Sequence, residues 1–285
     1  MYNLRYHIAS LVAVFLALSV GLLLGTIVVE RGVLNTQKTS LVQGLQKDYD
    51  RLRSDIEVIT ARADTAGAFS SEAEAAVIRD MLTGKTIVVV ADPSSAESVK
   101  YAVDTIRAAG GTAAIATLTE PGLALGNAGV LKAAATALAV PEASLDQTRV
   151  TAELAREWTT PGGARTLTNA LVAAGALKLD SFSAPAAADG VILASVWSDK
   201  PDAAALALGT AMTGPGRSAV GVETTNRSTG LARAAVGAGL SGVDDIDETF
   251  GRVSMVWLVA GRASGLYGVG KGAVGRYPSP LFPAQ

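Results

Sequence analysis

The sequence has 285 residues with 24 basic and 26 acidic side chains, a net charge of −2, which excludes a strong electrostatic footprint for nucleic acid. It has no cysteine and one histidine, His7, which excludes disulfides, thiolate metal sites and a serine–histidine nucleophile pair farther along the chain. The aromatic content of 5% and the many alanines predict a core of small, closely packed side chains.

The first predicted element is a membrane-spanning helix over residues 8–29, preceded by a short tail of residues 1–7. The segment, IASLVAVFLALSVGLLLGTIVV, carries no charge, and at ~1.5 Å per residue it makes a helix of about 33 Å, enough to cross a bilayer. A cleaved secretory signal is the alternative, but residues 28–31, VVER, offer no small-x-small cleavage site. We therefore predict an uncleaved, single-pass anchor.

One face of this helix carries a small residue at every fourth position. This small-xxx-small pattern lets two membrane helices bring their backbones close together, and it predicts a helix pair in the membrane. Lipid-facing small residues are the alternative, because the whole chain is rich in glycine (30 of 285). The residues of the predicted dimer face are Ala9, Ala13, Ala17, Gly21 and Gly25.

The charges that flank the helix do not fix its orientation. Arg5 lies before it, whereas Arg31, Lys38 and Lys47 follow it, so the usual excess of basic residues on the cytoplasmic side is not visible. A short cytoplasmic tail with the remainder exported is the common arrangement for a single anchor. We therefore expect a cell-membrane protein whose main domain is extracytoplasmic.

Residues 31–68 are predicted to form a coiled-coil stalk. Apolar residues fall on the a and d positions of a heptad, and Asp48 at g precedes Arg53 at the next e, the pairing that attracts two parallel chains. A parallel homodimer is the prediction, and a single amphipathic helix packed on its own domain is the alternative. The seam residues are Val42, Tyr49, Ile56 and Ala63 at a, and Leu45, Leu52, Ile59 and Ala66 at d.

The stalk is predicted to end at Gly67. Ser70 or Ser71 is predicted to cap the N-terminus of a separate helix over residues 72–82. This boundary leaves residues 70–285 as a head, which is enough for one domain of ordinary size.

The head is predicted to be an α/β domain with a mostly parallel sheet. Residues 86–91, TIVVVA, are β-branched without alternation, as in a strand covered on both faces. A strand–helix–strand pattern of this kind is a right-handed βαβ unit, and two such units separated by helices favour a three-layer domain. The units are predicted at residues 86–91, 94–109 and 112–118, and at 190–196, 202–212 and 218–223, with helices around 151–158 and 165–177.

No nucleotide motif accompanies this predicted fold. The first strand–helix turn, residues 91–95, reads ADPSS and lacks the G-x-G-x-x-G that cradles a pyrophosphate. The tripeptide GKT at residues 84–86 precedes a strand, whereas a phosphate loop follows one. We predict no cofactor and no enzymatic activity. A small-ligand receptor or enzyme stays open as an alternative, with Asp92, Ser94, Ser95 and Ser198 clustered at the carboxyl ends of the strands.

Four acidic residues, Asp244, Asp245, Asp247 and Glu248, precede a helix that is predicted to begin near Thr249. Carboxylates in such a group could hold a hard cation. We favour a solvated loop that caps the helix, because negative charge suits its N-terminal dipole. No metal site is therefore predicted.

Three passages resemble the actinobacterial copper-transport protein B (MctB-like) family, which includes the corynebacterial cell-division protein SteB. Residues 1–32, MYNLRYHIASLVAVFLALSVGLLLGTIVVERG, are similar to its N-terminus. Residues 242–247, GVDDID, resemble the turn before its last helix, and residues 265–268, GLYG, its G-x-Y-G near the end. The resemblance implies a non-enzymatic envelope protein with its head outside the cytoplasmic membrane.

The function implied by this resemblance has two forms. The family name implies copper transport or homeostasis, whereas the division-protein branch implies a SteA-like partner and a role in septal wall remodelling. We predict a membrane-anchored dimeric scaffold for a cell-envelope or division partner. Copper transport is the alternative, although the sequence has no cluster of soft ligands for copper.

Overall fold

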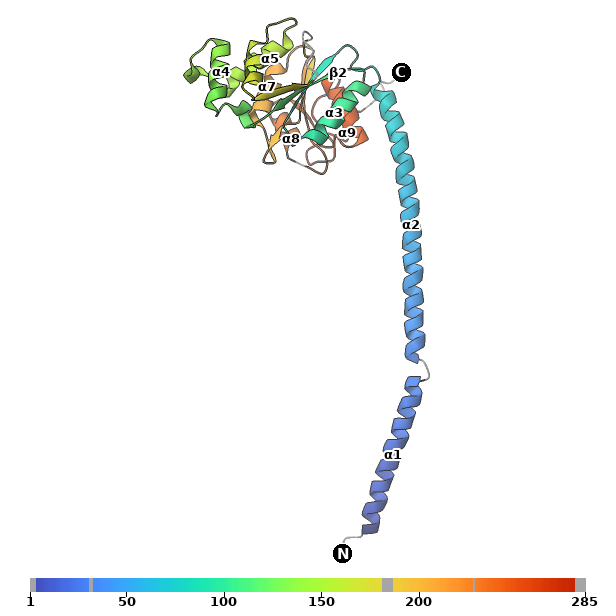
Figure 1. The fold of residues 1–285 in the computed structure, drawn as a ribbon. Coiled ribbons are helices and arrows are strands. Elements are labelled where there is room, and N and C mark those ends of the chain that lie inside the picture. Colours follow the sequence, from blue (N-terminus) through green and yellow to red (C-terminus); the bar gives the residue numbers. More distant parts are fainter. Residues whose placement is uncertain (1–3, 31–32, 181–186, 228, 280–285) are drawn as a thin grey trace. The chain divides into compact units, whose positions relative to one another are not determined.

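A computed structural model describes residues 4–30, 33–180, 187–227 and 229–279. The chain divides into two units, residues 1–67 and residues 68–285 (Figure 1). Residues 1–3 of the predicted tail and residues 31–32 of the predicted stalk lie outside the described residues.

Helix α1, Leu4–Glu30, contains the predicted anchor and extends it toward the N-terminus. Among the helices in the described ranges, its segment Leu4–Ile27 is the one whose length and hydropathy suit a membrane span, and none of that span is buried within the chain. The small residues at every fourth position are all exposed on it. Pairing through this face stays a prediction.

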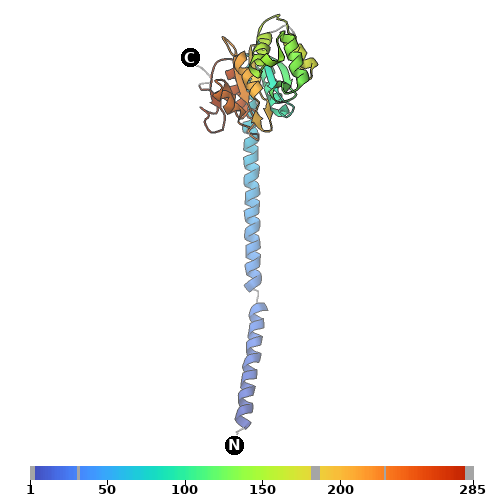
Figure 2. The ribbon, with the colours of Figure 1, turned by 90° about the vertical axis from the view of Figure 1, so that its left-hand side faces the viewer.

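Helix α2, Val33–Ile78, is a single helix of 46 residues, drawn without interruption in Figure 2. The prediction that Ser70 or Ser71 caps a separate helix over residues 72–82 is therefore wrong, although the division of the chain into two units does fall directly after Gly67. The last turns of α2 pack within the second unit, where Ile78 is fully buried.

The predicted seam of α2 is exposed in the single chain. All eight a and d residues, from Val42 to Ala66, have exposed side chains. Arg53 forms an ion pair with Glu57 of its own helix, with 3.2 Å between Nε and Oε1. The pairing of Asp48 with Arg53 across two chains stays a prediction.

The second unit contains a sheet of seven described strands in the order β3-β2-β1-β4-β7-β8-β9. Neighbouring strands are parallel except β2 and β3, which are antiparallel. Strands β1 and β2 match the predicted ranges, whereas β4 is shorter than predicted. The strands are β1 Thr86–Ala91, β2 Thr112–Leu118, β3 Leu177–Asp180, β4 Gly190–Leu193, β7 Ser218–Val222, β8 Ser241–Val243 and β9 Leu266–Tyr267, and a separate hairpin pairs β5 Val196–Trp197 with β6 Lys200–Pro201.

The helices of this unit connect the strands. The predicted helix over residues 165–177 is shorter, because it ends at Ala173 and the chain turns at Gly175, whose φ is positive, before β3 begins. The helices are α3 Ala96–Ala108, α4 Ala128–Leu138, α5 Gln147–Thr159, α6 Thr166–Ala173, α7 Ala203–Met212, α8 Leu231–Gly237 and α9 Thr249–Val259, with short 3₁₀ turns at Pro121–Ala124 and Glu142–Ser144.

Strand β1 is buried on both faces, which explains its unbroken apolar run. Val88 and Val90 belong to one cluster of buried residues, together with side chains of α5 and α7. Ile87 and Val89 belong to a second cluster, together with side chains of α3 and α9. Figure 1 shows these two pairs of helices on different sides of the strands. Burial of successive residues to opposite faces is what a central parallel strand requires.

Helix α8 approaches strand β8 closely at Gly242. A Cβ atom at this position would overlap the carbonyl oxygen of Ala232, so a side chain cannot be accommodated without moving the helix. Gly242 therefore allows α8 to lie directly on β8. This contact positions the end of β8, where the acidic residues begin.

We expect Gly242→Ala to lower the free energy of unfolding of the head by roughly 1–3 kcal/mol, because the added methyl group pushes α8 off the sheet. Urea unfolding of the detergent-solubilised full chain, followed by circular dichroism, measures this change. Gly237→Ala is the matched control on α8, since its added Cβ has no atom within 4 Å. Similar losses for both variants would contradict this account of Gly242.

Candidate functional site

The strand order places a topological switch point between β1 and β4. The chain passes from β1 to β2 on one side, while β4, β7, β8 and β9 follow on the other side. In open α/β sheets, ligands bind outside the carboxyl ends of the strands at such a point. The residues that follow β1 and β4 are therefore the first place to look for a site.

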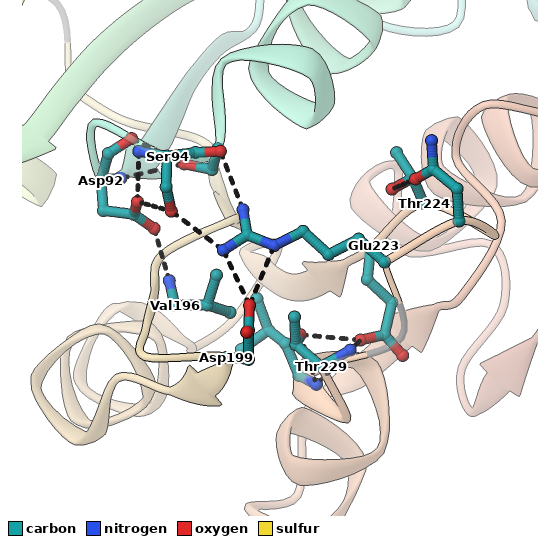
Figure 3. Close-up of polar contacts among 11 residues, drawn as sticks. Asp92, Ser94, Val196, Asp199, Glu223, Thr224 and Thr229 are labelled. Atoms are coloured by element: carbon teal, nitrogen blue, oxygen red, sulfur yellow. Dashed lines mark hydrogen bonds and ion pairs between the residues drawn. The ribbon is translucent and has the colours of Figure 1, made fainter.

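Asp92 directly follows β1 at this switch point and is almost fully buried. Its Oδ2 accepts a hydrogen bond from the backbone N–H of Val196 at 2.5 Å, and its Oδ1 accepts one from the N–H of Ser94 at 2.6 Å (Figure 3). The hydroxyl of Ser94 also donates to Oδ1. The carboxylate of Asp92 thus links the loop after β1 to the start of β5.

Arg227, in the loop after β7, joins three loops at the same end of the sheet. Its Nη1 donates to the carbonyl oxygen of Ser94 at 2.8 Å, and its Nη2 donates to Ser94 Oγ and to Asp199 Oδ1, each at 3.1 Å (Figure 3). Asp199 lies in the turn between β5 and β6, where Ser198 and Asp199 both have positive φ. The guanidinium group therefore holds these loops together through its hydrogen bonds.

The predicted cluster is partly confirmed. Asp92, Ser94 and Ser95 come together, and Ser95 Oγ accepts a hydrogen bond from the N–H of Asp92 at 3.0 Å. Ser198 lies in the neighbouring β5–β6 turn, where Asp199 makes the connection to Ser94 through Arg227. Sequence reasoning missed Arg227 because nothing near residue 227 in the sequence signals a partner at residue 94.

Two further carboxylates at the strand ends, those of Asp202 and Glu223, also accept hydrogen bonds from backbone N–H groups. Asp202 caps α7, since its Oδ1 accepts from the N–H of Ala204 at 2.9 Å, and its Oδ2 accepts from the indole N–H of Trp197 at 3.1 Å. Glu223, after β7, accepts from the N–H groups of Thr229 and Leu231 at 2.9 and 3.1 Å. Burial raises the pKa of Glu223, and these hydrogen bonds oppose the rise.

Asp244, after β8, brings the two C-terminal family-like passages together. Its Oδ1 accepts from the N–H of Val269 at 2.8 Å and its Oδ2 from that of Gly270 at 3.0 Å. A Cβ atom at Gly268 would overlap Asp244 Oδ1, so the chain after β9 passes directly over this carboxylate. Residues 242–247 and 265–268 are therefore neighbours in space, joined by the parallel pairing of β8 with β9.

Asp245 differs from the other carboxylates at this end of the sheet. Its side chain is fully buried, and among the described residues neither of its carboxylate oxygens has a hydrogen-bond partner. The backbone packs tightly around it, because a Cβ atom at Gly251 would overlap its Oδ1 and one at Gly268 would lie 3.0 Å from its Cγ. A buried carboxylate without donors is costly to ionise.

The surroundings of Asp245 favour its neutral form. Burial raises the pKa of Asp245 to about 7, and repulsion from Asp244, Asp247 and Glu248 adds to the rise, while Arg276 opposes it. The prediction of a wholly solvated acidic loop is therefore wrong for Asp245. This carboxylate sits beneath the start of α9 instead of facing water.

The predicted capping of α9 is also corrected. The helix begins at Thr249, as predicted, but the side chain of Glu248 in the N-cap position makes no capping hydrogen bond. Asp247 instead accepts from the N–H of Thr225 at 2.8 Å and from its hydroxyl. In the described part of the chain, no three His, Cys, Asp or Glu side chains converge on a metal position.

Comparison with known proteins identifies the family. The family described as "Copper transport outer membrane protein, MctB" matches residues 1–278. The chain belongs to the MctB family. This confirms the resemblance seen in residues 1–32, 242–247 and 265–268. Together with the apolar helix α1, the family description indicates an association with a membrane.

Curated relatives in the MctB family are the proteins named "Copper transporter MctB" of Mycobacterium tuberculosis and of Mycobacterium bovis. Each is 27% identical to this chain over 152 residues, which is 53% of this chain and 48% of the relative. The chain therefore matches these MctB proteins over about half of their length. No solved structure matches the chain.

The unpaired Asp245 predicts an unusual pH dependence of stability. Because its pKa in the folded head is about 7, above the value of about 4 in an unfolded chain, the folded state retains a proton that the unfolded state releases. The cost of ionising Asp245 is absent below about pH 4 and is complete above its folded pKa. Stability should therefore fall between pH 5 and pH 8.

We expect Asp245→Asn to raise the free energy of unfolding at pH 8 by the order of a few kcal/mol and to flatten its pH dependence. Urea unfolding of the full chain in detergent at pH 5 and pH 8 measures both effects. Asp104→Asn is the control, because the Asp104 side chain is 58% exposed. A parent protein that is more stable at pH 8 than at pH 5, with no gain in the variant, would refute the assignment.

Proposed function

We propose that this MctB-family protein is a membrane-anchored dimer that acts as a scaffold for a cell-envelope or division partner. In this proposal residues 1–7 are cytoplasmic, residues 8–29 span the membrane, residues 31–68 form a parallel coiled coil, and residues 70–285 form a three-layer α/β head outside the cytoplasmic membrane. The partner is an envelope protein, which the resemblance to the division branch makes SteA-like. No enzymatic step is assigned to the head.

The observation that carries the proposal is the exposed apolar seam of α2. Leu45 and Tyr49 each leave 68% of their surface exposed in the single chain, and Ile59 leaves 65%. A helix with a continuous apolar stripe in water gains free energy by pairing that stripe with another helix. The heptad spacing and the g-to-e placement of Asp48 and Arg53 suit a second, parallel copy of the same helix.

The membrane helix supports the same arrangement. Two chains that leave one face of a membrane must run parallel, which is the orientation that the g-to-e placement of Asp48 and Arg53 favours. The exposed small residues of α1 are suited to close packing of two helices in lipid, which provides no hydrophobic driving force of its own. Pairing of α1 in the membrane therefore favours pairing of α2, and the reverse also holds.

The carboxyl ends of the strands support a non-catalytic role for the head. Asp92, Asp202, Glu223 and Asp244 all accept hydrogen bonds from backbone N–H groups of their own chain. Groups used in this way hold loops in place, which favours a structural role for them over substrate binding. A surface of fixed loops is suited to recognising another protein.

Copper transport or homeostasis is the second candidate function. The description of the family and the names of the mycobacterial relatives favour it. For copper transport the protein would need either a transient copper site of its own or a partner that carries the metal. The two candidates differ in whether the purified chain binds copper.

We expect Leu52→Asp to abolish dimers, because it places a charge in the apolar seam. Chemical crosslinking in native membranes and sedimentation of the full chain in detergent measure the loss. Ser54→Asp is the matched control, since residue 54 lies at an outward f position of the same heptad, and it should leave the dimer intact. A parent chain that is monomeric in both measurements would refute the proposed dimer.

A copper experiment separates the two candidate functions. If the protein is a scaffold, the purified full chain binds neither Cu(I) nor Cu(II) stoichiometrically at micromolar concentration, and a deletion strain keeps its copper tolerance. Competition with a chromogenic chelator measures binding, and growth on graded copper measures tolerance. Stoichiometric binding together with a copper-sensitive deletion strain would favour the transport candidate.

A further inference from the structure

An apolar groove lies within the second unit, between the C-terminal turns of α2 and helix α9. Its volume is about 360 Å³. The ion pair of Glu74 with Arg252, 2.7 Å between Oε2 and Nη2, fastens α2 to α9 beside it, with both side chains mostly buried. The apolar side chains that line the groove are Phe69, Ala73 and Val77 of α2, Phe250 and Val253 of α9, and Tyr277.

The α2 side of this groove continues the heptad register of the stalk. Counting on from Ala63 and Ala66, Ser70 falls at a, Ala73 at d and Val77 at a. These three residues are half-buried, whereas Ala63 and Ala66 are exposed. The face that α2 would present to a second copy therefore extends into the groove, where α9 adds a wall.

Phe69 occupies the g position of this register and leaves 72% of its surface exposed. In a parallel two-stranded coiled coil, a g residue lies next to the e residue of the following heptad in the other chain. For Phe69 that residue is Glu74, which borders the groove. The relation is the same as that of Asp48 to Arg53, with an aromatic side chain in place of a charge.

We propose that Phe69 of a second copy of this chain inserts into the groove beside Glu74 and packs against Phe250 and Val253. The dimer interface then extends from the stalk into the head, and α9 becomes part of it. Two-fold symmetry gives each chain one Phe69 to insert and one groove to receive it. The inference rests on the parallel pairing proposed above.

The energetics favour this arrangement. Removing an aromatic ring from water is among the largest single contributions to association, and aromatic anchors in pockets dominate many interfaces. The groove is already formed in the single chain, and the buried Glu74–Arg252 pair holds its two sides together. Insertion therefore requires little reorganisation of the head.

Disulfide crosslinking tests the extent of the interface, because the chain has no cysteine of its own. Single substitutions Ala66→Cys, Ala73→Cys and Ala75→Cys are made in the full chain and oxidised in native membranes. Positions 66 and 73 are both d positions, one in the stalk and one in the groove, and position 75 is an exposed f position. We expect covalent dimers for the first two and none for the third.

The outcomes separate this inference from the proposed function. Crosslinking of Ala66→Cys without Ala73→Cys leaves the paired stalk in place and overturns insertion into the groove. Failure of both refutes the pairing of the stalk itself. Equal crosslinking of Ala75→Cys would indicate random collision and would also overturn the inference.

A second variant tests the anchor itself. We expect Phe69→Ala to raise the dimer dissociation constant about tenfold, as for other aromatic interface anchors. Sedimentation equilibrium of the full chain in detergent measures the constant, and thermal unfolding of the head should be unchanged because Phe69 is exposed. Val274→Ala is the control, since Val274 is 75% exposed on the same unit. An unchanged constant for Phe69→Ala would overturn the insertion.

Discussion

The end of the sheet that carries the functional candidates depends on carboxylates that accept hydrogen bonds from backbone N–H groups. All parallel strands finish at this end, so several loops meet there with N–H groups that no strand ladder can satisfy. Asp92, Asp202, Glu223 and Asp244 supply the missing acceptors. The composition of this end resembles that of an enzyme site, but its polar groups are used to hold loops.

Asp245 lies at the same end of the sheet, but among the described residues no group donates a hydrogen bond to its carboxylate. Its neighbour Asp244 takes the N–H groups of the chain that follows β9, and two glycines bring the backbone against Asp245 itself. Two of the three passages that resemble the family, residues 242–247 and 265–268, meet at this corner. In this chain glycine and aspartate are needed together here, because a Cβ atom at Gly268 would overlap Asp244 Oδ1.

The sequence predicted β1, β2, β4 and β7 of the sheet and missed β3, β8 and β9. Strands β1 and β2 were located at their observed bounds, whereas β8 and β9, with three and two residues, have no periodicity to detect. Helix α2 passes through Gly67, which is exposed with no described atom near its Cβ position, because a single glycine costs a helix only about 1 kcal/mol. Asp245 was misjudged because four acidic residues within five positions normally face water, and only the fold reveals which of them is enclosed.

The outermost strands of the sheet limit how copies of this chain can associate. One border is β3, a four-residue antiparallel strand, and the other is β9, with only two residues. Such short borders offer few free backbone groups to a foreign strand, which is a common protection against aggregation through added strands. Proteins crowded at a membrane surface can then meet repeatedly through their helices while their sheets stay separate.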